Sequence, residues 1–369
     1  MADDGHVEVR DIETEKQDLL ISHFRGQPAG FARFGRAGYL MPQSFRAHAQ
    51  ALRAMTTRPD DAWVVTFPRS VSPFHIKLKM TTNSTPRRRQ AVHPRESAEA
   101  LMLTFAGTTW TQEMVWLIKN DLDYETALQI PLQNRYLFLE YFSIISGIEI
   151  EIGDPDKDFI DKLKVPAYKI SEDVPSPRFI KTHLALSLLP PRLLDTCKVV
   201  YVARDPRDVV VSYYHFTQLI KHLHFVEDFK SFWKLFMAGL VTWAPSFPHL
   251  KEAWAQRKHP NMLFLFYEDM KKDMPSTLRR VSAFFGKEYS AEQLAALCEH
   301  LDIKNFKNNE STNPAWMKAD SPLTFGGREE FVRKGEVGGW RNYMDAEMQA
   351  EAARWIQDNL ADTDLRFPS

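Results

Sequence analysis

Four short apolar runs constrain the fold of this chain more than any other feature of its sequence. They occupy residues 62–67, 178–182, 198–203 and 262–267. Each run has the length of a strand, lacks strict alternation of apolar and polar residues, and is separated from the next by helical patterning. This pattern is typical of strands that are buried on both faces of a parallel sheet. The sequence therefore predicts an α/β protein with a three-layer α/β/α, P-loop-like fold around a central parallel sheet.

Polar side chains stand at or just after the end of each predicted strand. In order along the chain they are Arg69 and Ser70, then Lys181, Thr182 and His183, then Arg204, and then Tyr267. In open parallel sheets, ligands bind beyond the carboxyl ends of the strands. We therefore expect these residues to meet at one edge of the sheet and to form the functional site there.

Composition narrows the class of protein. The 369 residues carry a net charge of −1 and are 44% hydrophobic, so we expect a soluble globular chain that does not bind nucleic acid. Cys197 and Cys298 are too few for a disulfide framework, which suits a reducing compartment. No run approaches the roughly 18 apolar residues of a membrane span, and the N-terminus lacks an apolar signal core. We expect a cytoplasmic protein with no membrane partner.

The chain divides into an N-terminal segment, residues 1–60, which packs on a main domain at residues 61–367. The segment is predicted to contain a hairpin or turn near Gly35 and Gly38. Gly286 is placed to end one of the predicted helices. The helices are expected at 44–55, 108–119, 208–219, 229–238, 249–256, 275–285 and 345–359.

A phosphate-binding loop is present in two separated halves, TFPRS at 66–70 and GTTWT at 107–111. Joined, they read as a strand, a tight turn with a cation, a glycine, two hydroxyls and a helix. A glycine turn at a helix N-terminus presents backbone N–H groups to an anion. Thr108 and Thr109 add hydroxyl donors and Arg69 adds a charge suited to phosphate or sulfate. The alternative is an ordinary capped strand–helix turn. The cation precedes the glycine, unlike in the Walker loop.

Two further motifs suggest anion binding. In residues 199–216 a buried strand ends at Arg204 and a helix begins near Asp208, so Ser212 faces back toward Arg204. These two residues suit a phosphate, and the alternative is an Arg–Asp pair at a helix start. In residues 331–340, two cations precede three glycines and a tryptophan, which suggests a flap over an anion. The alternative there is a solvated basic loop.

The chain resembles the cytosolic sulfotransferase family, which moves a sulfuryl group from 3′-phosphoadenosine 5′-phosphosulfate (PAPS) to an acceptor hydroxyl or amine. The resemblance spans about residues 59–367, apart from an insertion. It rests on six strings that occur in the family's order: PDDAWVVTFPRS, GTTW, FIKTHLALSLLP, VVYVARDPRDVVVSYYHF, LFYEDM and RKGEVGGW.

The resemblance implies a role for each matching position. His183 corresponds to the catalytic base, and Lys181 and Arg69 to the cations at the transferring group. The loop that holds the 5′-phosphosulfate corresponds to Arg69, Ser70, Gly107, Thr108, Thr109 and Trp110. The 3′-phosphate site corresponds to Arg204, Ser212, Arg333, Lys334 and Gly335, and Trp110 and Tyr267 would flank adenine.

The residue chemistry agrees with these roles. A neutral histidine at a strand end can take a hydroxyl proton, and cations stabilise the leaving phosphate oxygen in an in-line transfer. PAPS would be the donor, no metal would be needed, and the acceptor would be a small hydrophobic hydroxyl compound such as a phenol, steroid or retinoid.

Several positions depart from the family pattern. Arg69 stands where the family most often has lysine, and Leu301 and Ile303 replace a hydroxyl and an aromatic near the nucleotide. Gly339 replaces an aspartate. The family's dimer motif is not recognisable in 341–351, so a homodimer stays open, and the acceptor-gating segment 241–246 is divergent.

The insertion is the 36-residue stretch 71–106 inside the phosphate-binding loop. It has no sustained period and contains an RRR run, so we predict disorder. It is interpreted as a surface excursion, as a basic targeting or nucleic-acid segment, or as a translated intron, because Val-Ser can be encoded by a splice-donor sequence and Phe-Ala-Gly by an acceptor. Closing such a loop costs only about 3 kcal/mol. The insertion nevertheless lies where N–H groups must converge, so weak donor binding is expected.

Two other functions compete with sulfuryl transfer. An inactive nucleotide-fold protein that binds ligands or partners would follow if the insertion breaks the loop. An ATP- or GTP-dependent kinase is disfavoured because no lysine of the Walker type follows Gly107.

Overall fold

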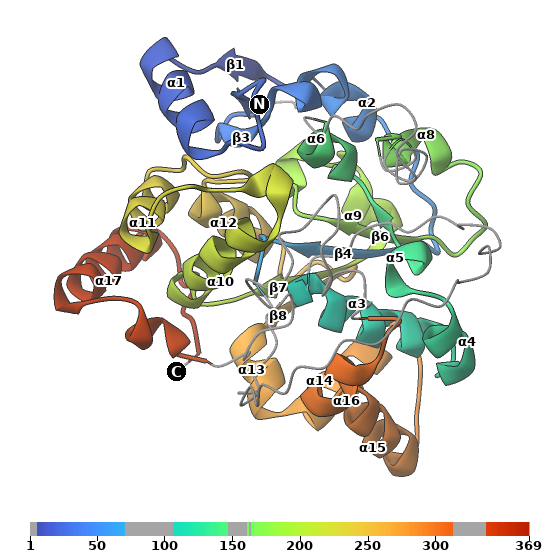
Figure 1. Cartoon of the computed structure of the whole chain (residues 1–369). Helices are drawn as coiled ribbons and strands as arrows, with labels where there is room; N and C mark the ends of the chain where they lie inside the picture. The colour runs from blue at the N-terminus through green and yellow to red at the C-terminus, as the bar shows by residue number, and fades with distance from the viewer. Residues whose placement is uncertain (1–5, 71–105, 147–160, 162–163, 313–336, 369) are drawn as a thin grey trace, which may run out of the picture.

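A five-stranded parallel sheet forms the centre of the molecule (Figure 1). This computed structural model describes residues 6–70, 106–146, 161, 164–312 and 337–368. The strands lie in the order β5-β6-β4-β7-β8, and every neighbouring pair is parallel. Their bounds are β4 Ala62–Thr66, β5 Leu137–Phe138, β6 Phe179–Thr182, β7 Lys198–Ala203 and β8 Met262–Phe266. The predicted fold class is confirmed, and the four predicted strands are present; β5 is an additional short strand.

Helices fill most of the connections between these strands. They are α1 Thr14–His23, α2 Ala49–Arg53, α3 Ala106–Lys119, α4 Tyr124–Gln129, α5 Leu132–Arg135, α6 Tyr141–Ile145, α8 Ala167–Ile170, α9 Leu193–Thr196, α10 Pro206–Leu219, α11 Phe229–Met237, α12 Ser246–Ala255, α13 Tyr267–Lys272, α14 Met274–Phe284, α15 Ala291–His300, α16 Ile303–Asn308 and α17 Ala346–Leu360. Short 3₁₀ helices are η1 Gln43–Ala47, η2 Leu186–Leu188, η3 Lys221–Leu223 and η5 Gly339–Asn342.

The predicted helices are found with small differences at their ends. The one expected at 44–55 is split into η1 and α2. The helix expected to start at 249 begins at Ser246. Pro248 is tolerated in its first turn, because the backbone N–H groups there have no intrahelical acceptor and proline therefore removes no hydrogen bond. Gly286 follows α14 with a φ of +69°, as its predicted stop position requires.

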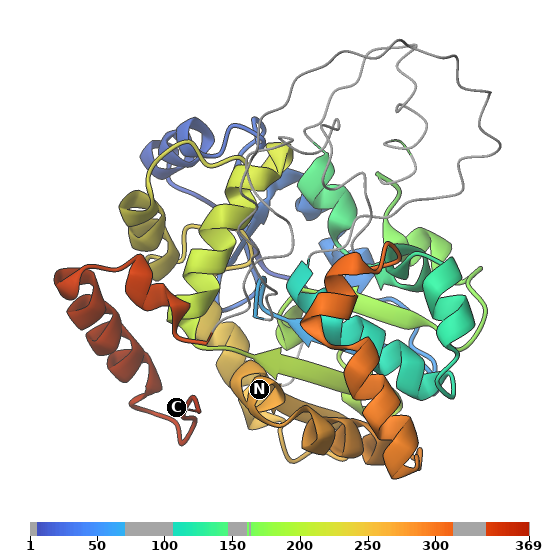
Figure 2. The same ribbon diagram turned by 60° about the horizontal axis from the view of Figure 1, so that its bottom comes forward.

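Two hydrophobic clusters lie on opposite faces of the sheet and make the three layers. Ala62 and Val64 point into a cluster with α3, α14 and α15, whereas Trp63 and Val65 point into a larger cluster with α10, α11 and α12. Figures 1 and 2 show α3 and α10 on opposite sides of the strands. Both faces of β4 are therefore buried, which explains why its sequence lacks alternation.

The N-terminal segment forms a second, antiparallel sheet of three strands. They are β1 Val9–Asp11, β2 Phe31–Phe34 and β3 Tyr39–Pro42, and the β2–β3 turn contains Gly35 and Gly38 at positive φ, so the predicted hairpin is confirmed. The predicted domain boundary near residue 60 stays a prediction. The predicted insertion lies outside the described residues except for Ala106, which is the first residue of α3.

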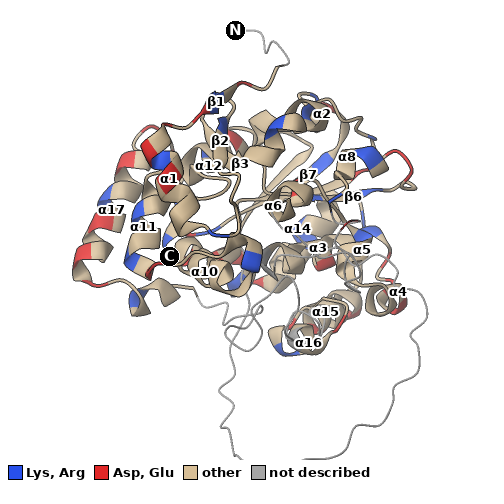
Figure 3. Cartoon of the chain, turned by 45° about the horizontal axis from the view of Figure 1, so that its top comes forward, with Lys and Arg blue, Asp and Glu red and all other residues tan. Residues whose placement is uncertain are grey.

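Charges of both signs are interspersed along α1 and α17 (Figure 3). This distribution agrees with the nearly balanced net charge. Among the helices of the described residues, none combines the length and the apolar character that crossing a bilayer requires.

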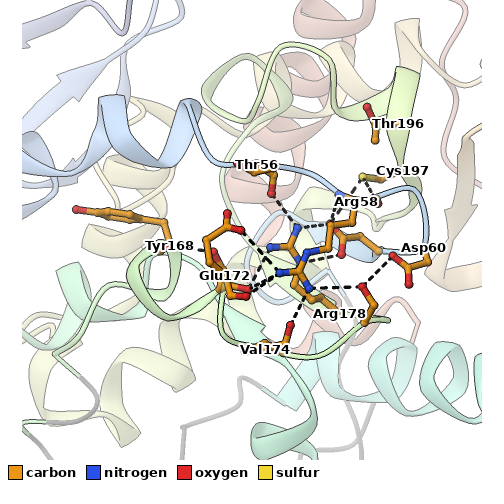
Figure 4. Close-up of polar contacts among 12 residues, drawn as sticks. Thr56, Arg58, Asp60, Tyr168, Glu172, Val174, Arg178, Thr196 and Cys197 are labelled. Atoms are coloured by element: carbon orange, nitrogen blue, oxygen red, sulfur yellow. Dashed lines mark hydrogen bonds and ion pairs between the residues drawn. The ribbon is translucent and has the colours of Figure 1, made fainter.

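A buried ion pair fixes the starts of neighbouring strands at the end of the sheet opposite the predicted site. Arg178, directly before β6, donates from Nε and Nη2 to the Asp61 carboxylate, directly before β4, at 2.8 and 2.7 Å. Arg178 also donates to the Thr56 carbonyl at 2.8 Å, and Cys197, directly before β7, donates from Sγ to the Arg58 carbonyl at 3.2 Å (Figure 4). The first residues of β6, β4 and β7 are thereby aligned.

Replacing Arg178 with methionine should destabilise the fold by about 3–5 kcal/mol, because Asp61 would keep a buried charge without its partner. Urea denaturation at pH 7 measures this loss. The matched control is Arg192→Met, which breaks the exposed Arg192–Asp195 pair and should change stability by about 0–1 kcal/mol. Equal stability of Arg178→Met and the native chain would contradict a structural role for the buried pair.

Candidate active site

The two halves of the split loop meet at the carboxyl end of β4. Thr66 Oγ1 and Thr108 Oγ1 are 3.0 Å apart and both are buried, although 42 positions separate them in the chain. Gly107 lies in the first turn of α3, which follows the loop as expected. The structure thus brings the strand end and the helix N-terminus together on either side of the insertion.

His183 is held directly beside this junction. Its Nδ1 lies 2.8 Å from the Thr66 carbonyl oxygen and 3.1 Å from Thr66 Oγ1. A carbonyl oxygen only accepts, so Nδ1 carries the hydrogen and Nε2 is left with a lone pair. Burial, and then the charge of Lys181, lower the pKa of His183 well below its usual value. The neutral ring therefore has the form that a general base requires.

Two predicted cations, Lys181 and Arg69, lie near His183, and a third, Arg204, lies beside Arg69. Lys181 lies two residues earlier on β6, with Nζ 4.5 Å from the centroid of the Phe138 ring, and burial lowers its pKa well below the usual value. Arg69, at a positive φ of 66°, donates from Nε to Ser212 Oγ at 2.9 Å. Arg204 Nη1 lies 3.5 Å from the Arg69 carbonyl. Residues predicted for the 5′ and 3′ ends of the nucleotide are thus neighbours.

The two predicted adenine-flanking residues contact each other. Trp110 and Tyr267 have ring centroids 6.1 Å apart at an interplanar angle of 66°, an edge-to-face arrangement. The Arg204 guanidinium lies 4.5 Å from the Tyr267 centroid, and Trp110 Nε1 donates to the Leu301 carbonyl at 2.9 Å. Leu301, which departs from the family pattern, therefore holds Trp110 through its backbone.

Asp208 places the chain that follows the RKG motif beside Arg204. Its carboxylate accepts the backbone N–H groups of Gly338 at 2.7 Å and Trp340 at 3.1 Å, and lies 4.0 Å from Arg204. The predicted residues Arg333, Lys334 and Gly335 lie outside the described residues.

Ser70 was predicted to bind the phosphosulfate. Its hydroxyl donates a hydrogen bond to the Phe67 carbonyl at 2.8 Å. This bond closes the turn between β4 and Arg69. The predicted role of Ser70 at the phosphosulfate stays a prediction.

Sequence reasoning did not single out two residues that contact the predicted base, although one of them, Trp243, lies in the segment 241–246 expected to gate the acceptor. Glu140 is fully buried and accepts hydrogen bonds from Thr182 Oγ1 and from the His183 backbone N–H, both at 2.7 Å. Trp243 donates from Nε1 to Glu140 at 3.1 Å, and its ring centroid is 5.3 Å from that of His183. Burial raises the pKa of Glu140 to about 7, against the effect of the hydrogen bonds it accepts. The signal available in the sequence was a carboxylate directly after the apolar string LFL.

Metal chemistry was not expected. Within the part of the chain that the structure describes, three or more His, Cys, Asp or Glu side chains do not come together as a metal-binding group. The expected absence of a metal stays a prediction.

A parallel sheet whose carboxyl edge carries a helix N-terminus, buried cations and a neutral histidine defines a group-transfer protein for an anionic donor. Comparisons with known proteins give the family. A family model described as "Sulfotransferase domain" matches residues 101–364. This chain therefore belongs to the sulfotransferase family, and the predicted family and enzyme class are confirmed.

Individual relatives agree with this family. Luciferin sulfotransferase of Photinus pyralis is 33% identical over 264 residues, which are 69% of this chain and 69% of that protein. Sulfotransferase 1C2 of Homo sapiens is 31% identical over 266 residues, 71% of this chain and 82% of that protein. A crystal structure of retinol dehydratase in a complex with retinol and PAP matches with a TM-score of 0.80 at 36% identity, covering 98% of this chain and 99% of that one.

The His183 ring should stay neutral in the folded chain as the pH falls through 6.5, because its charged form is disfavoured by burial and by Lys181. Two-dimensional NMR of ¹⁵N-labelled imidazoles measures this, with the resonance assigned by its loss in His183→Ala. The chain unfolded in urea is the reference, in which the same ring titrates near pH 6.5. A folded-state titration at or above that value would contradict the structure.

Proposed function

We propose that this chain transfers the sulfuryl group of PAPS to the hydroxyl of a small hydrophobic acceptor, with His183 as the base. The observation that carries this proposal is the bond of His183 Nδ1 to the Thr66 carbonyl, 2.8 Å long, at the junction of the two loop halves. This bond uses the hydrogen on Nδ1, so Nε2 is the nitrogen of the neutral ring that can accept a proton, and the predicted phosphate-binding turn lies alongside.

The residues divide the chemistry between them. His183 takes the proton of the acceptor hydroxyl as that oxygen forms its bond to sulfur. The bond from sulfur to the 5′-phosphate oxygen breaks, and Lys181 and Arg69 stabilise the negative charge that develops on the leaving phosphate. Burial of both cations strengthens this electrostatic effect, because little water remains to screen it.

The donor assignment also draws on Arg204 and Ser212. Both are buried next to Arg69 and offer a guanidinium and a hydroxyl to a second phosphate group. Structures of retinol dehydratase, which is similar over nearly all of this chain, are complexes with PAP, the nucleotide that remains when PAPS loses its sulfuryl group.

The acceptor class rests on the surroundings of the base. The ring of His183 contacts the aromatic rings of Phe138 and Trp243 at 5.4 and 5.3 Å. Such walls favour an apolar acceptor. Retinol and androsterone are the small molecules in the retinol dehydratase complexes, and both support a hydrophobic alcohol.

Replacing His183 with alanine should lower kcat by roughly 10²–10⁴-fold, the usual contribution of a general base. The dissociation constant of PAP should change by less than about twofold, because the nucleotide groups are held by other residues. Transfer of ³⁵S-sulfuryl from PAPS to retinol, a steroid alcohol and a phenol measures the first quantity, and calorimetry measures the second. His23→Ala, at the end of α1, is the control. Retained turnover would remove His183 from its role.

Deleting residues 71–106 should tighten PAP binding by roughly tenfold, about 1.4 kcal/mol, because the chain would no longer have to order a long insertion within the loop. The full and shortened chains are titrated with PAP and, separately, with ATP and Mg²⁺. Equal affinity of both chains for PAP would show that the insertion leaves the loop intact. Preference for ATP and Mg²⁺ would contradict the donor and favour a kinase.

A further inference from the structure

We propose that Glu140 is a positioning residue that fixes the base strand and the acceptor-side tryptophan relative to each other. The contacts that define this unit, the Glu140 clamp, run from one carboxylate to Thr182, His183 and Trp243. The inference rests on the proposed function, since His183 is there the group that receives the acceptor proton.

Glu140 supplies a hydrogen-bond acceptor at the point where the pairing of β5 with β6 ends. β5 contains two residues and pairs with β6 only at Leu137↔Ile180 and Phe138↔Lys181, with one further backbone bond from Leu139 to the Lys181 carbonyl. Directly after β6, His183 has a buried backbone N–H, and Glu140 Oε1 accepts its hydrogen bond at 2.7 Å. A side-chain carboxylate thus replaces a strand carbonyl, because a buried N–H left without a partner is costly.

The second carboxylate oxygen fixes the turn after the base. Glu140 Oε2 accepts from Thr182 Oγ1 at 2.7 Å, and the same hydroxyl oxygen accepts from the Leu184 N–H at 3.0 Å. Both sides of His183 along the chain are therefore tied to Glu140. Its ring is then oriented by its own bond to Thr66.

Trp243 brings a distant part of the chain to the same carboxylate. Its indole N–H donates to Glu140 Oε1, and its ring lies edge-on to His183 at 76°. The Trp243 backbone N–H donates to the Leu40 carbonyl and the Leu40 N–H donates to the Ala244 carbonyl, both at 2.7 Å. The clamp therefore connects the N-terminal sheet, the segment predicted to gate the acceptor, and the base.

Loss of Glu140 should affect the position of the base and the aromatic wall at the acceptor while leaving nucleotide binding unchanged, whereas loss of a purely structural residue would affect all three. Loss of the Glu140 bond to His183 displaces the base, and displacement of about 1 Å costs up to roughly 100-fold in rate. Loss of the indole bond releases the aromatic wall that faces the acceptor. Nucleotide binding should respond to neither change, because none of the donors to Glu140 is a residue assigned to the phosphates.

The test compares Glu140→Gln, Trp243→Phe and the double variant with Glu351→Gln. The last is a matched control, because Glu351 accepts the indole N–H of Trp233 at 2.8 Å, between α11 and α17 and away from the site. Glu140→Gln should lower kcat by roughly tenfold or more, with the PAP dissociation constant within about twofold. Trp243→Phe should mainly raise the acceptor KM. The fold loss of kcat/KM in the double variant should be smaller than the product of the two single fold losses, because both substitutions remove the same hydrogen bond between Glu140 and Trp243.

Indole ¹⁵N–H NMR gives a second measurement that does not need turnover. The Trp243 resonance, assigned by its loss in Trp243→Phe, should shift in Glu140→Gln and stay in place in Glu351→Gln. Absence of sulfuryl transfer by the native chain would contradict the proposed function. The shift of the Trp243 indole resonance would still test whether Glu140 bonds to Trp243 as the clamp requires. An unmoved Trp243 resonance, or full kcat in Glu140→Gln with an active native chain, would overturn the clamp.

Discussion

The register of the central strands is the constraint on which the rest of the structure depends. Ala62 of β4 lies opposite Phe179 of β6 on one side and Lys198 of β7 on the other. The Asp61–Arg178 pair fixes the first of these alignments at the amino end of the sheet, where both charges are fully buried. Parallel strands that start together also end together when their lengths are similar. Thr66, His183 and Arg204 therefore reach one edge.

At that edge the protein buries the cationic side chains of Arg69, Lys181 and Arg204. Arg69 bonds to a serine hydroxyl, Lys181 lies against the Phe138 ring, and Arg204 lies 4.0 Å from the carboxylate of Asp208. Burying charge in this way is unfavourable unless an anion offsets it. The proposed donor carries a phosphosulfate and a second phosphate, and its binding beside these residues would supply such an anion.

Residues whose position depends on local sequence were predicted, whereas residues positioned by contacts with distant parts of the chain were not. The four main strands and the positions of Lys181, His183 and Arg204 were predicted, because period and strand ends are local properties. β5 was missed since two residues give no periodic signal. Glu140 was missed because its donors lie 42 to 103 positions away, at Thr182, His183 and Trp243. The edge-to-face contact of Trp110 with Tyr267 also required packing that neither local sequence reveals.

By itself, the sequence determined the α/β class and the family, because buried strands lack alternation and the family's strings occur in order along the chain. It also predicted the sheet edge at which the site lies, because polar residues follow each buried strand. It also showed the two halves of the predicted phosphate-binding turn on either side of the predicted insertion. Only the tertiary structure decided that these halves meet, with Thr66 and Thr108 3.0 Å apart, and that the carboxylate of Glu140 joins His183 to Trp243. The reason is physical: a parallel sheet aligns strand ends that are far apart in sequence, and buried donors there must take whichever acceptor the fold brings to them.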